Sequence, residues 1–320
     1  MTARGERSGA GDEERPILGW DVGGTKSAAV VASPGGEVLD RREWPSRVER
    51  GWQAMLEEFL ERLGELGRLA EQAAGLGVSI GGPLNPLTGV ILGPPHLPGW
   101  HDVPLAEILQ RRLGLPVVVE HDAVTCLLAE CLWGAARGAA SAIYLTCGTG
   151  CGAGILTRGQ IVRGPAGQSP EVGHVRLAPD GPPIFGKAGC VESFCGGEGI
   201  SKLAPFLYPG RFTQPVEPRR LAELAAAGED EARAVLMESA RRTGQLCALL
   251  ADIFSPQVIV LGSLARYLPP WWRDEIIRSF HEEALPANSA ETRIVPAELA
   301  ERLQDLSAAA GWIWRQRHGA

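Results

Sequence analysis

The sequence has no long apolar run and no dense cluster of basic residues. No segment reaches the roughly 18 consecutive apolar residues that a membrane-spanning helix needs. Residues 1–14 are polar, without the apolar core of a signal peptide, and we interpret them as a disordered tail. Acidic residues outnumber basic ones by 38 to 31, a net charge of −7 that disfavours a nucleic-acid-binding face. We therefore expect neither a membrane nor a nucleic acid as partner.

The sequence also lacks any Cys-x-x-Cys pair. Its seven cysteines are scattered along 320 residues, and an odd, scattered set is typical of reduced thiols and not of a disulfide framework. This usage predicts a cytoplasmic protein. With 45% hydrophobic and 22% charged residues, the composition is that of a globular chain, and its length suggests about two domains.

A glycine-rich turn between two short apolar runs occurs twice. The first, DVGGTK at residues 21–26, lies between ILGW and AAVV, and the second, TCGTGCG at residues 146–152, lies between AIYL and AGIL. Glycine lets backbone N–H groups approach a phosphate closely, and threonine adds a hydroxyl donor. One such turn is often only a turn. Two matched copies about 125 residues apart favour phosphate binding in each half of a duplicated ATPase.

Neither turn matches the two best-known phosphate-binding patterns. Thr25 separates Gly24 from Lys26, so the first turn is not a Walker A loop. Ala153 stands where the third glycine of a Rossmann fingerprint would follow the second turn. The turns therefore indicate phosphate binding on some other fold.

The rest of the chain alternates between helical and strand patterns. Apolar residues at three- and four-residue steps predict a helix over 52–69, and short apolar runs predict strands at 76–80, 117–119 and 258–261. Further helices are expected after Asp122, at about 218–254 and at about 300–316. This alternation predicts an α/β fold, and we place a domain boundary near Asp122, between the two turns.

Asp122 follows a buried strand and opens a helix. One interpretation is a helix N-cap, because aspartate is a preferred residue there. The other is a general base at the carboxyl end of a parallel strand, where open α/β sheets bind their ligands. A carboxylate in that place can take the proton of a substrate hydroxyl during phosphoryl transfer.

A third group of polar residues lies in the middle of the chain, where EVGH at residues 171–174 precedes Glu192. A glutamate and a histidine three apart in a loop are often only surface polar residues. Carboxylates and imidazole on loops are also what recognition of sugar hydroxyls requires. Composition alone leaves both interpretations open.

Six short motifs in order resemble the ROK family of repressors and sugar kinases. The motifs are DVGGT at 21–25, PHLPGW at 95–100, EHD at 120–122, LTCGTG at 145–150, EVGH at 171–174 and GCVE at 189–192. The match runs from about residue 17 to about residue 262, which is most of the chain. Among members of the family, the chain looks most like bacterial glucokinases and related hexose kinases.

The resemblance implies a fold and a reaction. The fold is that of actin-like, ribonuclease-H-like ATPases, an α/β fold with two lobes around a central cleft. Residues 15–122 would form the small N-terminal lobe, joined by the C-terminal helix at 300–316, and residues 123–299 the large lobe. The reaction is phosphorylation of a hexose by ATP, with Mg²⁺ arriving on the nucleotide. Members are often homo-oligomers, so a dimer or tetramer is expected.

The resemblance also implies roles for individual residues. Asp122 would be the base that activates a sugar hydroxyl, usually the one on C6. The phosphate loops would be Asp21, Gly23, Gly24, Thr25 and Lys26 in the first turn and Gly148, Thr149 and Gly150 in the second, with Gly262 beside the adenosine. The sugar would contact Gly81, His121, Asp122, Glu171, His174 and Glu192.

One departure from the family pattern concerns its structural zinc. The family's zinc loop combines the histidine of EVGH with three cysteines, and here two of those cysteine positions hold Pro183 and Phe185. Only His174 and Cys190 remain, whereas a tetrahedral site needs four ligands. We predict no structural zinc, and that Pro183 and Phe185 instead stiffen and pack this loop.

A second departure is the presence of two histidines where the family usually has asparagine. His121 precedes the expected base, and His96 lies in the PHLPGW motif. Histidine differs from asparagine in reach and donor pattern and can be charged near neutral pH. Plain glucose, an isomer altered at C3 or C4, an amino sugar, an N-acetylated sugar and a cyclitol all stay open as substrates.

Two other classes of function are alternatives to the kinase. A ROK-type transcriptional regulator would carry a helix-turn-helix domain before the first turn, and only about sixteen residues precede Ile17. A non-catalytic sugar sensor would be expected to lose Asp122 or the glycine-rich turns, and all three are present. The sequence therefore favours an enzyme, a carbohydrate kinase.

Overall fold

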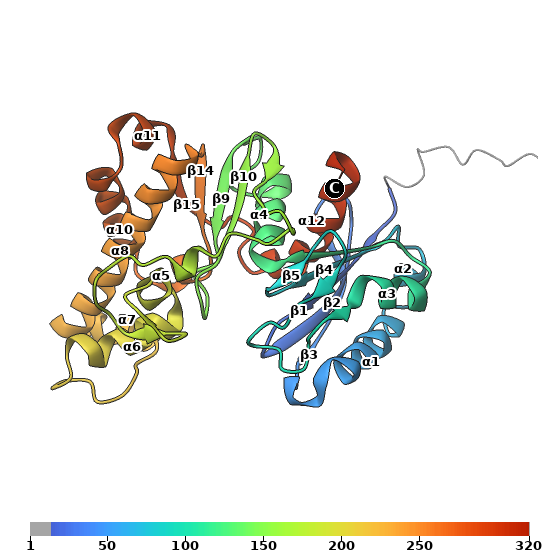
Figure 1. The fold of residues 1–320 in the computed structure, drawn as a ribbon, viewed down its shortest axis with the longest axis horizontal. Helices are drawn as coiled ribbons and strands as arrows, with labels where there is room; N and C mark the ends of the chain where they lie inside the picture. Colours follow the sequence, from blue (N-terminus) through green and yellow to red (C-terminus); the bar gives the residue numbers. More distant parts are fainter. Residues whose placement is uncertain (1–13, 320) are drawn as a thin grey trace, which may run out of the picture. The chain divides into compact units, whose positions relative to one another are not determined.

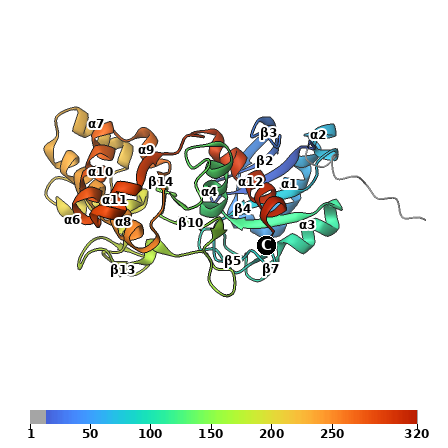
Figure 2. The same cartoon turned by 90° about the horizontal axis from the view of Figure 1, so that it is seen from above.

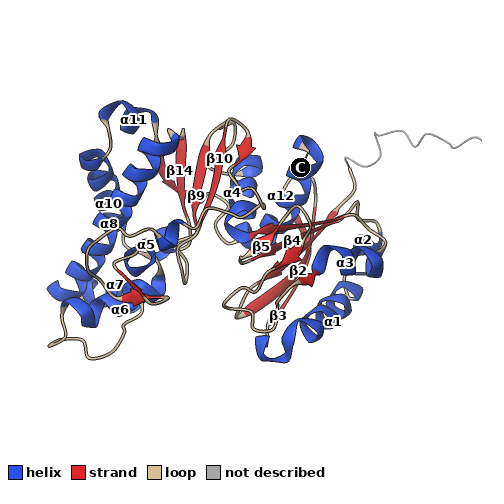
Figure 3. Cartoon of the chain, in the orientation of Figure 1, coloured by secondary structure: helices blue, strands red, loops and turns tan. Residues whose placement is uncertain are grey.

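The structure is a computed structural model that describes residues 14–319. Of the tail expected at residues 1–14, all but Glu14 lies outside the described residues. Helices and strands alternate along the chain, as the sequence predicts (Figure 3). Over residues 14–319, no helix is long and apolar enough to cross a membrane.

Contacts divide the chain into two compact units. The first unit holds the described residues up to Trp133, Gly164–Gln168 and those from Glu301 onward, and the second holds Gly134–Arg163 and Ser169–Ala300. The first unit thus extends past the boundary that we expected at Asp122. The reason is that the helix beginning at Asp122 packs against the C-terminal helix, which also belongs to the first unit.

The first unit is built on a five-stranded sheet with the order β3-β2-β1-β4-β8. β1, β2 and β3 form an antiparallel meander, and β4 and β8 run parallel to β1. Its strands are β1 (Ile17–Val22), β2 (Lys26–Ala32), β3 (Val38–Pro45), β4 (Leu76–Ile80), β8 (Val117–His121) and a small sheet of β5 (Leu84–Asn85), β6 (Val90–Ile91) and β7 (Val103–Pro104). Its helices are η1 (Val48–Arg50), α1 (Gly51–Gly64), α2 (Gly67–Glu71), α3 (Leu105–Leu113), α4 (Asp122–Trp133) and α12 (Arg302–His318).

Helix α12 packs closely on the sheet because two strands present glycine to it. A Cβ on Gly77 of β4 would lie 1.8 Å from the carbonyl oxygen of Ala308, and one on Gly19 of β1 would lie 3.2 Å from the Cβ of Ala308. Figures 1 and 2 both show α12, in red, beside α4. The apolar core of this unit includes Trp20, whose ring stacks on Phe59 of α1 at a centroid distance of 4.3 Å.

The second unit repeats the same sheet topology. Its strand order is β11-β10-β9-β14-β15, again with three antiparallel strands followed by two that run parallel to the first. The strands are β9 (Ala142–Leu145), β10 (Ala153–Thr157), β11 (Gln160–Ile161), β14 (Val258–Leu261), β15 (Arg293–Pro296) and a hairpin of β12 (Pro183–Ile184) and β13 (Lys187–Ala188). The helices are η2 (Val172–His174), α5 (Val191–Cys195), α6 (Gly197–Leu207), α7 (Pro218–Ala226), α8 (Asp230–Phe254), α9 (Leu264–Tyr267), α10 (Pro270–Glu283) and α11 (Pro286–Glu291).

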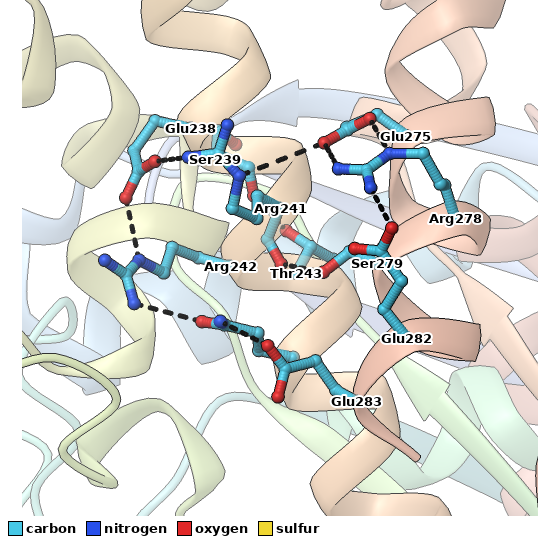
Figure 4. Close-up of polar contacts among 11 residues, drawn as sticks. Glu238, Ser239, Arg241, Arg242, Thr243, Glu275, Arg278, Ser279, Glu282 and Glu283 are labelled. Atoms are coloured by element: carbon cyan, nitrogen blue, oxygen red, sulfur yellow. Dashed lines mark hydrogen bonds and ion pairs between the residues drawn. The ribbon is translucent and has the colours of Figure 1, made fainter.

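Helices α8 and α10 form the main helical layer of the second unit. Gly244 of α8 permits the close approach, since a Cβ there would lie 2.6 Å from the carbonyl oxygen of Ile276. Around this contact, polar side chains join the helices (Figure 4). Ser279 donates to the carbonyl oxygen of Arg241 at 2.9 Å, and Gln245 donates to Glu283 at 3.0 Å. The pair is therefore held by both packing and polar contacts.

Candidate active site

The first glycine-rich turn joins β1 and β2, and its backbone is fixed from behind. The N–H of Gly23 donates to the carbonyl oxygen of Lys26 at 3.1 Å. The carbonyl oxygen of Gly23 in turn accepts a hydrogen bond from the Ser46 hydroxyl at 2.6 Å. Gly24 and Thr25 remain exposed. The turn thus presents a rigid, exposed backbone, as a phosphate-binding loop requires.

Lys26 is the member of this turn whose side chain is already engaged. Its ammonium group lies 2.9 Å from a carboxylate oxygen of Glu43 on β3, and Glu43 also pairs with Arg41. Both Lys26 and Glu43 are partly exposed, so the pair is weak. A phosphate role for Lys26 stays a prediction, and it would require the ammonium group to exchange Glu43 for the phosphate.

Asp122 stands at the carboxyl edge of the parallel strands, where β8 ends and α4 begins. Its Oδ1 accepts the N–H of Ala123 at 2.6 Å and lies 3.1 Å from Nδ1 of His121. Its Oδ2 lies 3.9 Å from the point that a Cβ on Gly81 would occupy. The side chain is 47% exposed. One oxygen is therefore anchored at the helix start while the carboxylate stays accessible, which is compatible with both interpretations of this residue.

The two histidines of the first unit lie in different surroundings. The ring of His121 packs over Gly82, where a Cβ would come within 2.8 Å of Cδ2. His96 lies beside the first turn, since a Cβ on Gly24 would be 3.4 Å from both its Cβ and its carbonyl oxygen. The structure thus brings His121 to the expected base and His96 to the first glycine-rich turn.

Asp21, at the end of β1, is a carboxylate with an unusual environment. Burial is the main cause that raises its pKa from 3.8 to about 7; the negative charges of Asp122 and Asp305 contribute to the rise, and Lys26 and the hydrogen bond to Ser79 oppose it. Asp305 lies on α12, and its charge is paired with Arg41 at 2.7 Å. Asp21 and Asp122 are therefore electrostatically coupled at the same edge of the sheet.

The second glycine-rich turn joins β9 and β10 and is supported by α6. The carbonyl oxygens of Gly148 and Thr149 accept the N–H groups of Gly197 and Glu198 at 2.8 and 2.9 Å. Gly262 packs against the start of the turn: a Cβ on Gly262 would come within 1.9 Å of the carbonyl oxygen of Thr146. The predicted Gly262 thus belongs to the same assembly as the second turn.

A cavity of about 490 Å³ opens beside this second turn. It is lined by residues of the turn, of α6 and of the segments before α7 and around α9, namely Gly148, Thr149, Gly197, Glu198, Ser201, Lys202, Pro215, Glu217, Pro218, Ser263 and Tyr267. Its volume falls within the range typical of small-molecule sites. Of its lining residues, only those of the turn were predicted from the sequence.

Glu192 of α5 is the centre of the second unit's polar group. A Cβ on Gly150 would lie 2.5 Å from its Oε1, and one on Gly173 would lie 3.1 Å from its Oε2. Burial, together with the smaller effects of the charges of Glu198 and Glu171, raises its pKa to about 7. The structure therefore places Glu192 beside the second turn and near the charge of Glu171, and the roles of these residues in a site stay predictions.

His174 lies on the same segment, but its ring faces the loop where the family's zinc would be held. The imidazole lies 5.6 Å from the ring of Phe185, and Cys190 makes a polar contact of 3.3 Å with the Ser193 hydroxyl. Among the described residues, no three His, Cys, Asp or Glu side chains come together as metal ligands. The donors of this loop do not fit a tetrahedral zinc site, and the absence of zinc stays a prediction.

Comparison with known proteins gives the family. The ROK family model matches residues 17–313, so the chain belongs to the ROK family, and the resemblance seen in the sequence is confirmed. Among solved structures, the ROK hexokinase of Thermus thermophilus is 32% identical, with a TM-score of 0.81 and coverage of 92% of this chain and 97% of that one. The predicted α/β fold class of actin-like ATPases is confirmed as well.

Other relatives carry the names of specific enzymes. The glucokinase of Halalkalibacterium halodurans is 29% identical over 96% of this chain and 97% of its own length. The N-acetylmannosamine kinase of Shigella flexneri is 29% identical over 77% of this chain and 82% of its own length. A glucokinase structure from Streptomyces griseus, in complex with glucose and AMPPNP, is 26% identical, with a TM-score of 0.77 and coverage of 94% and 99%.

Two kinds of residue that lie near predicted site residues, one in each unit, were not predicted from the sequence. One is the cavity lining, including Lys202 and Tyr267, which lies in segments without a recognisable motif. The other is the pair Ser79 and Thr125, whose hydroxyls lie beneath Asp21 and Asp122. Ser79 is the only hydroxyl residue in the apolar run LGVSI, and that signal could have drawn attention to it.

Proposed function

We propose that this chain transfers the γ-phosphoryl group of ATP to a hydroxyl of a hexose, the C6 hydroxyl, with Asp122 as the general base. As a class, the enzyme is a carbohydrate kinase, in keeping with its membership of the ROK family and with the kinase names of its relatives. The observation that carries the finer proposal is the placement of Asp122: it is anchored through Oδ1 and accessible through the rest of its carboxylate.

The base would act on a hydroxyl that the sugar presents to Oδ2. Because Oδ1 is held by the N–H of Ala123, the carboxylate is kept in one orientation before the substrate arrives. Proton transfer to a positioned carboxylate makes the attacking oxygen a better nucleophile as the bond to phosphorus forms. Gly81 leaves space beside Oδ2 of Asp122, and the His121 ring lies beside Oδ1.

The nucleotide would be bound through the two glycine-rich turns and the cavity of the second unit. Gly148, Thr149 and Gly262 lie at or beside that cavity, which has room for a nucleoside. The exposed backbone of Gly24 and Thr25 provides N–H donors in the first unit. Mg²⁺, arriving on ATP, would neutralise charge that develops on the phosphates. The AMPPNP complex of the Streptomyces griseus relative supports ATP as the donor.

The sugar would be held mainly by the carboxylates of the second unit. Glu171 and Glu192 would supply acceptors for ring hydroxyls, and His121 of the first unit would add an imidazole. A sugar contact of His174 stays a prediction, because its ring lies beside that of Phe185. The similarity to both a glucokinase and an N-acetylmannosamine kinase supports two substrate classes, hexoses and N-acetylated sugars. His121, which differs from the usual asparagine of the family, favours the alternative of an amino sugar, an N-acetylated sugar or a cyclitol.

The test measures ADP release from Mg-ATP with a panel of acceptors, beside the Asp122→Asn variant. The panel contains glucose, mannose, allose, glucosamine, N-acetylglucosamine, N-acetylmannosamine and a cyclitol. We expect turnover of one or a few of these, reduced about 10²- to 10⁴-fold in the variant. Full activity of the variant would remove Asp122 from the base role. Sugar binding without turnover across the panel would favour a non-catalytic sensor.

A cytoplasmic location and a dimer or tetramer remain predictions, to be checked by cell fractionation and by light scattering.

A further inference from the structure

Two buried hydroxyls lie between the two carboxylates of the first unit. In the sheet, Asp21 of β1 is directly opposite Ser79 of β4, and Ser79 is opposite Glu120 of β8. This row is polar although the strands around it are apolar. Ser79 is 1% exposed and Thr125 of α4 is fully buried. Burying hydroxyl groups is unfavourable unless they form hydrogen bonds, so their partners explain why they are there.

The partners form a continuous link across the unit. The Ser79 hydroxyl bonds to the Asp21 carboxyl on one side and lies 2.9 Å from the Thr125 hydroxyl on the other. The Thr125 hydroxyl donates to the backbone carbonyl of Asp122 at 2.8 Å. Three hydrogen bonds therefore lead from the end of β1, where the first turn begins, to the first residue of α4.

Counting protons shows when this link is complete. Each hydroxyl has one proton to donate, and a carbonyl oxygen can only accept. Because Thr125 donates to the carbonyl of Asp122, Ser79 must donate to Thr125, and Asp21 must then supply the proton between itself and Ser79. The link is thus complete when Asp21 is protonated. Burial and the nearby charges of Asp122 and Asp305 raise the pKa of Asp21 to about 7, against the lowering effects of Lys26 and of the hydrogen bond to Ser79, so the protonated form is populated near neutral pH.

We propose that Ser79 and Thr125 are positioning residues, which tie the backbone of Asp122 to Asp21 and so hold the base where it meets the sugar hydroxyl. This inference rests on the proposed function, in which Asp122 is the base. Because both hydroxyls are buried, we expect neither of them to touch the substrate. Their loss should therefore lower kcat through misplacement of the carboxylate and leave the KM values for sugar and ATP nearly unchanged.

Matched variants separate this role from an ordinary buried hydrogen bond. Thr125→Val removes the hydroxyl and keeps the shape, while Thr125→Ser keeps the hydroxyl. Ser79→Ala removes the other hydroxyl of the link. Thr243→Val is the control, because Thr243 is also fully buried and donates at 2.8 Å to a backbone carbonyl of its own helix, that of Ser239, in the second unit (Figure 4).

The assay uses the full chain, Mg-ATP and the panel sugar with the highest turnover, with melting temperatures recorded in parallel. We expect Thr125→Val and Ser79→Ala each to lower kcat by about tenfold or more, with both KM values within about twofold. Thr125→Ser should recover most of the loss, and the double variant Ser79→Ala/Thr125→Val should be no slower than the worse single variant. Thr243→Val should lower the melting temperature with kcat unchanged.

The inference is overturned if Thr125→Val has the kcat of the Thr243→Val control, or if the losses of the two single variants multiply in the double variant. Ser79→Ala decides the matter if Thr125→Val does not fold. Asp122→Asn in the same assay keeps the two proposals apart. If Asp122→Asn is inactive and Thr125→Val is unaffected, only the positioning role of the link is refuted. If Asp122→Asn is fully active, the base role of Asp122 is refuted as well.

Discussion

The two units of this protein share a sheet topology but support their glycine-rich turns in different ways. In the first unit, Asp21 lies near the end of the strand that leads into the turn, on a polar row with Ser79. In the second unit, the corresponding turn contains two buried cysteines, Cys147 and Cys151, which are grouped with Cys195. One turn is thus joined to a hydrogen-bonded network and the other rests on an apolar core.

The electrostatics of the units are nevertheless parallel. Each contains one carboxylate whose pKa is raised to about 7, Asp21 in the first and Glu192 in the second. In both cases burial is the main cause and neighbouring carboxylates add to it. Groups that titrate near neutral pH are typical of functional sites. Each unit therefore has its own carboxylate that titrates near neutral pH, and in each unit this carboxylate lies beside the glycine-rich turn.

The glycines of the two turns should differ most clearly in what an added methyl group disturbs. A Cβ on Gly23 would lie 2.6 Å from the backbone carbonyl oxygen of Lys26, which cannot move without opening the hairpin. Gly23→Ala should lower the free energy of unfolding by about 1–3 kcal/mol and the melting temperature by several degrees.

A Cβ on Gly150 would instead meet the movable end of the Glu192 side chain at 2.5 Å. Gly150→Ala should keep the melting temperature and raise the sugar KM about tenfold.

Each turn offers its own control for this contrast. A Cβ on Gly24 would have its nearest neighbour at 3.4 Å, and one on Gly148 at 3.6 Å, so alanine fits in both places. Differential scanning calorimetry of Gly24→Ala and Gly148→Ala should give melting temperatures equal to that of the parent chain. A loss of stability in Gly148→Ala as large as in Gly23→Ala would contradict the difference between the turns.

Glu192 should make sugar binding dependent on pH. Sugar hydroxyls donate best to an ionised carboxylate, and the raised pKa of Glu192, about 7, leaves it mostly protonated below that pH. The sugar KM should therefore rise about tenfold between about pH 8 and about pH 6. Glu192→Gln should show a high KM at every pH. Glu198→Gln removes one of the charges that raise this pKa, and it should move the rise in KM to lower pH. An unchanged pH profile in Glu192→Gln would assign the effect to another group.

Much of the fold followed from local patterns, whereas the candidate site residues came from motifs, and their roles stay predictions. The strand at Leu76–Ile80 and the two hairpins around the turns appear where the apolar runs predict them. The helix predicted over 52–69 is divided into α1 and α2, because Gly64 and Gly67 interrupt it. Strand β3 was not predicted, since its residues alternate between partly buried and exposed positions and include few apolar ones. The link through Ser79 depends on the register between β1 and β4, and single-sequence patterns do not contain that information.

Asp21 should give the stability of the first unit a pH dependence of a recognisable sign. Its pKa in the folded chain, about 7, lies above the ordinary 3.8, so protonation favours the folded state. This contribution is fully present below about pH 4 and is lost as the pH rises to about 7. Asp21→Asn is neutral throughout, and its melting temperature should exceed that of the parent chain at about pH 8 but not at about pH 4.

Asp40→Asn provides a control of opposite sign in the same unit. The pKa of Asp40 is lowered by the backbone N–H of Arg41 and by the side chain of Arg42, so its contribution is present at neutral pH and lost in acid. Asp40→Asn should therefore be less stable than the parent chain at neutral pH, by a small amount because the group is on the surface. If Asp21→Asn also loses stability at neutral pH, the Asp21 carboxylate is stabilising, and the raised pKa is wrong.

The smallest expected difference concerns the thiols of the two units. The first unit holds Cys126 and Cys131, each 9% exposed, whereas Cys147, Cys151, Cys190, Cys195 and Cys247 of the second unit are at most 4% exposed. Burial raises the pKa of Cys131 to about 12, and contacts with Cys147 and Cys195, together with burial, raise that of Cys151, so few thiolates are present for reaction.

Labelling of the native chain with a thiol reagent, located by peptide mass spectrometry, tests this order. Modification should be slow throughout, and it should reach Cys126 and Cys131 first, because fraying of α4 exposes them more easily than opening of the second unit's core exposes the others. All seven cysteines should react once the chain is unfolded. Labelling of Cys151 before Cys126 would reverse the comparison: it would mean that the second turn opens away from its apolar core more readily than α4 frays from the first unit.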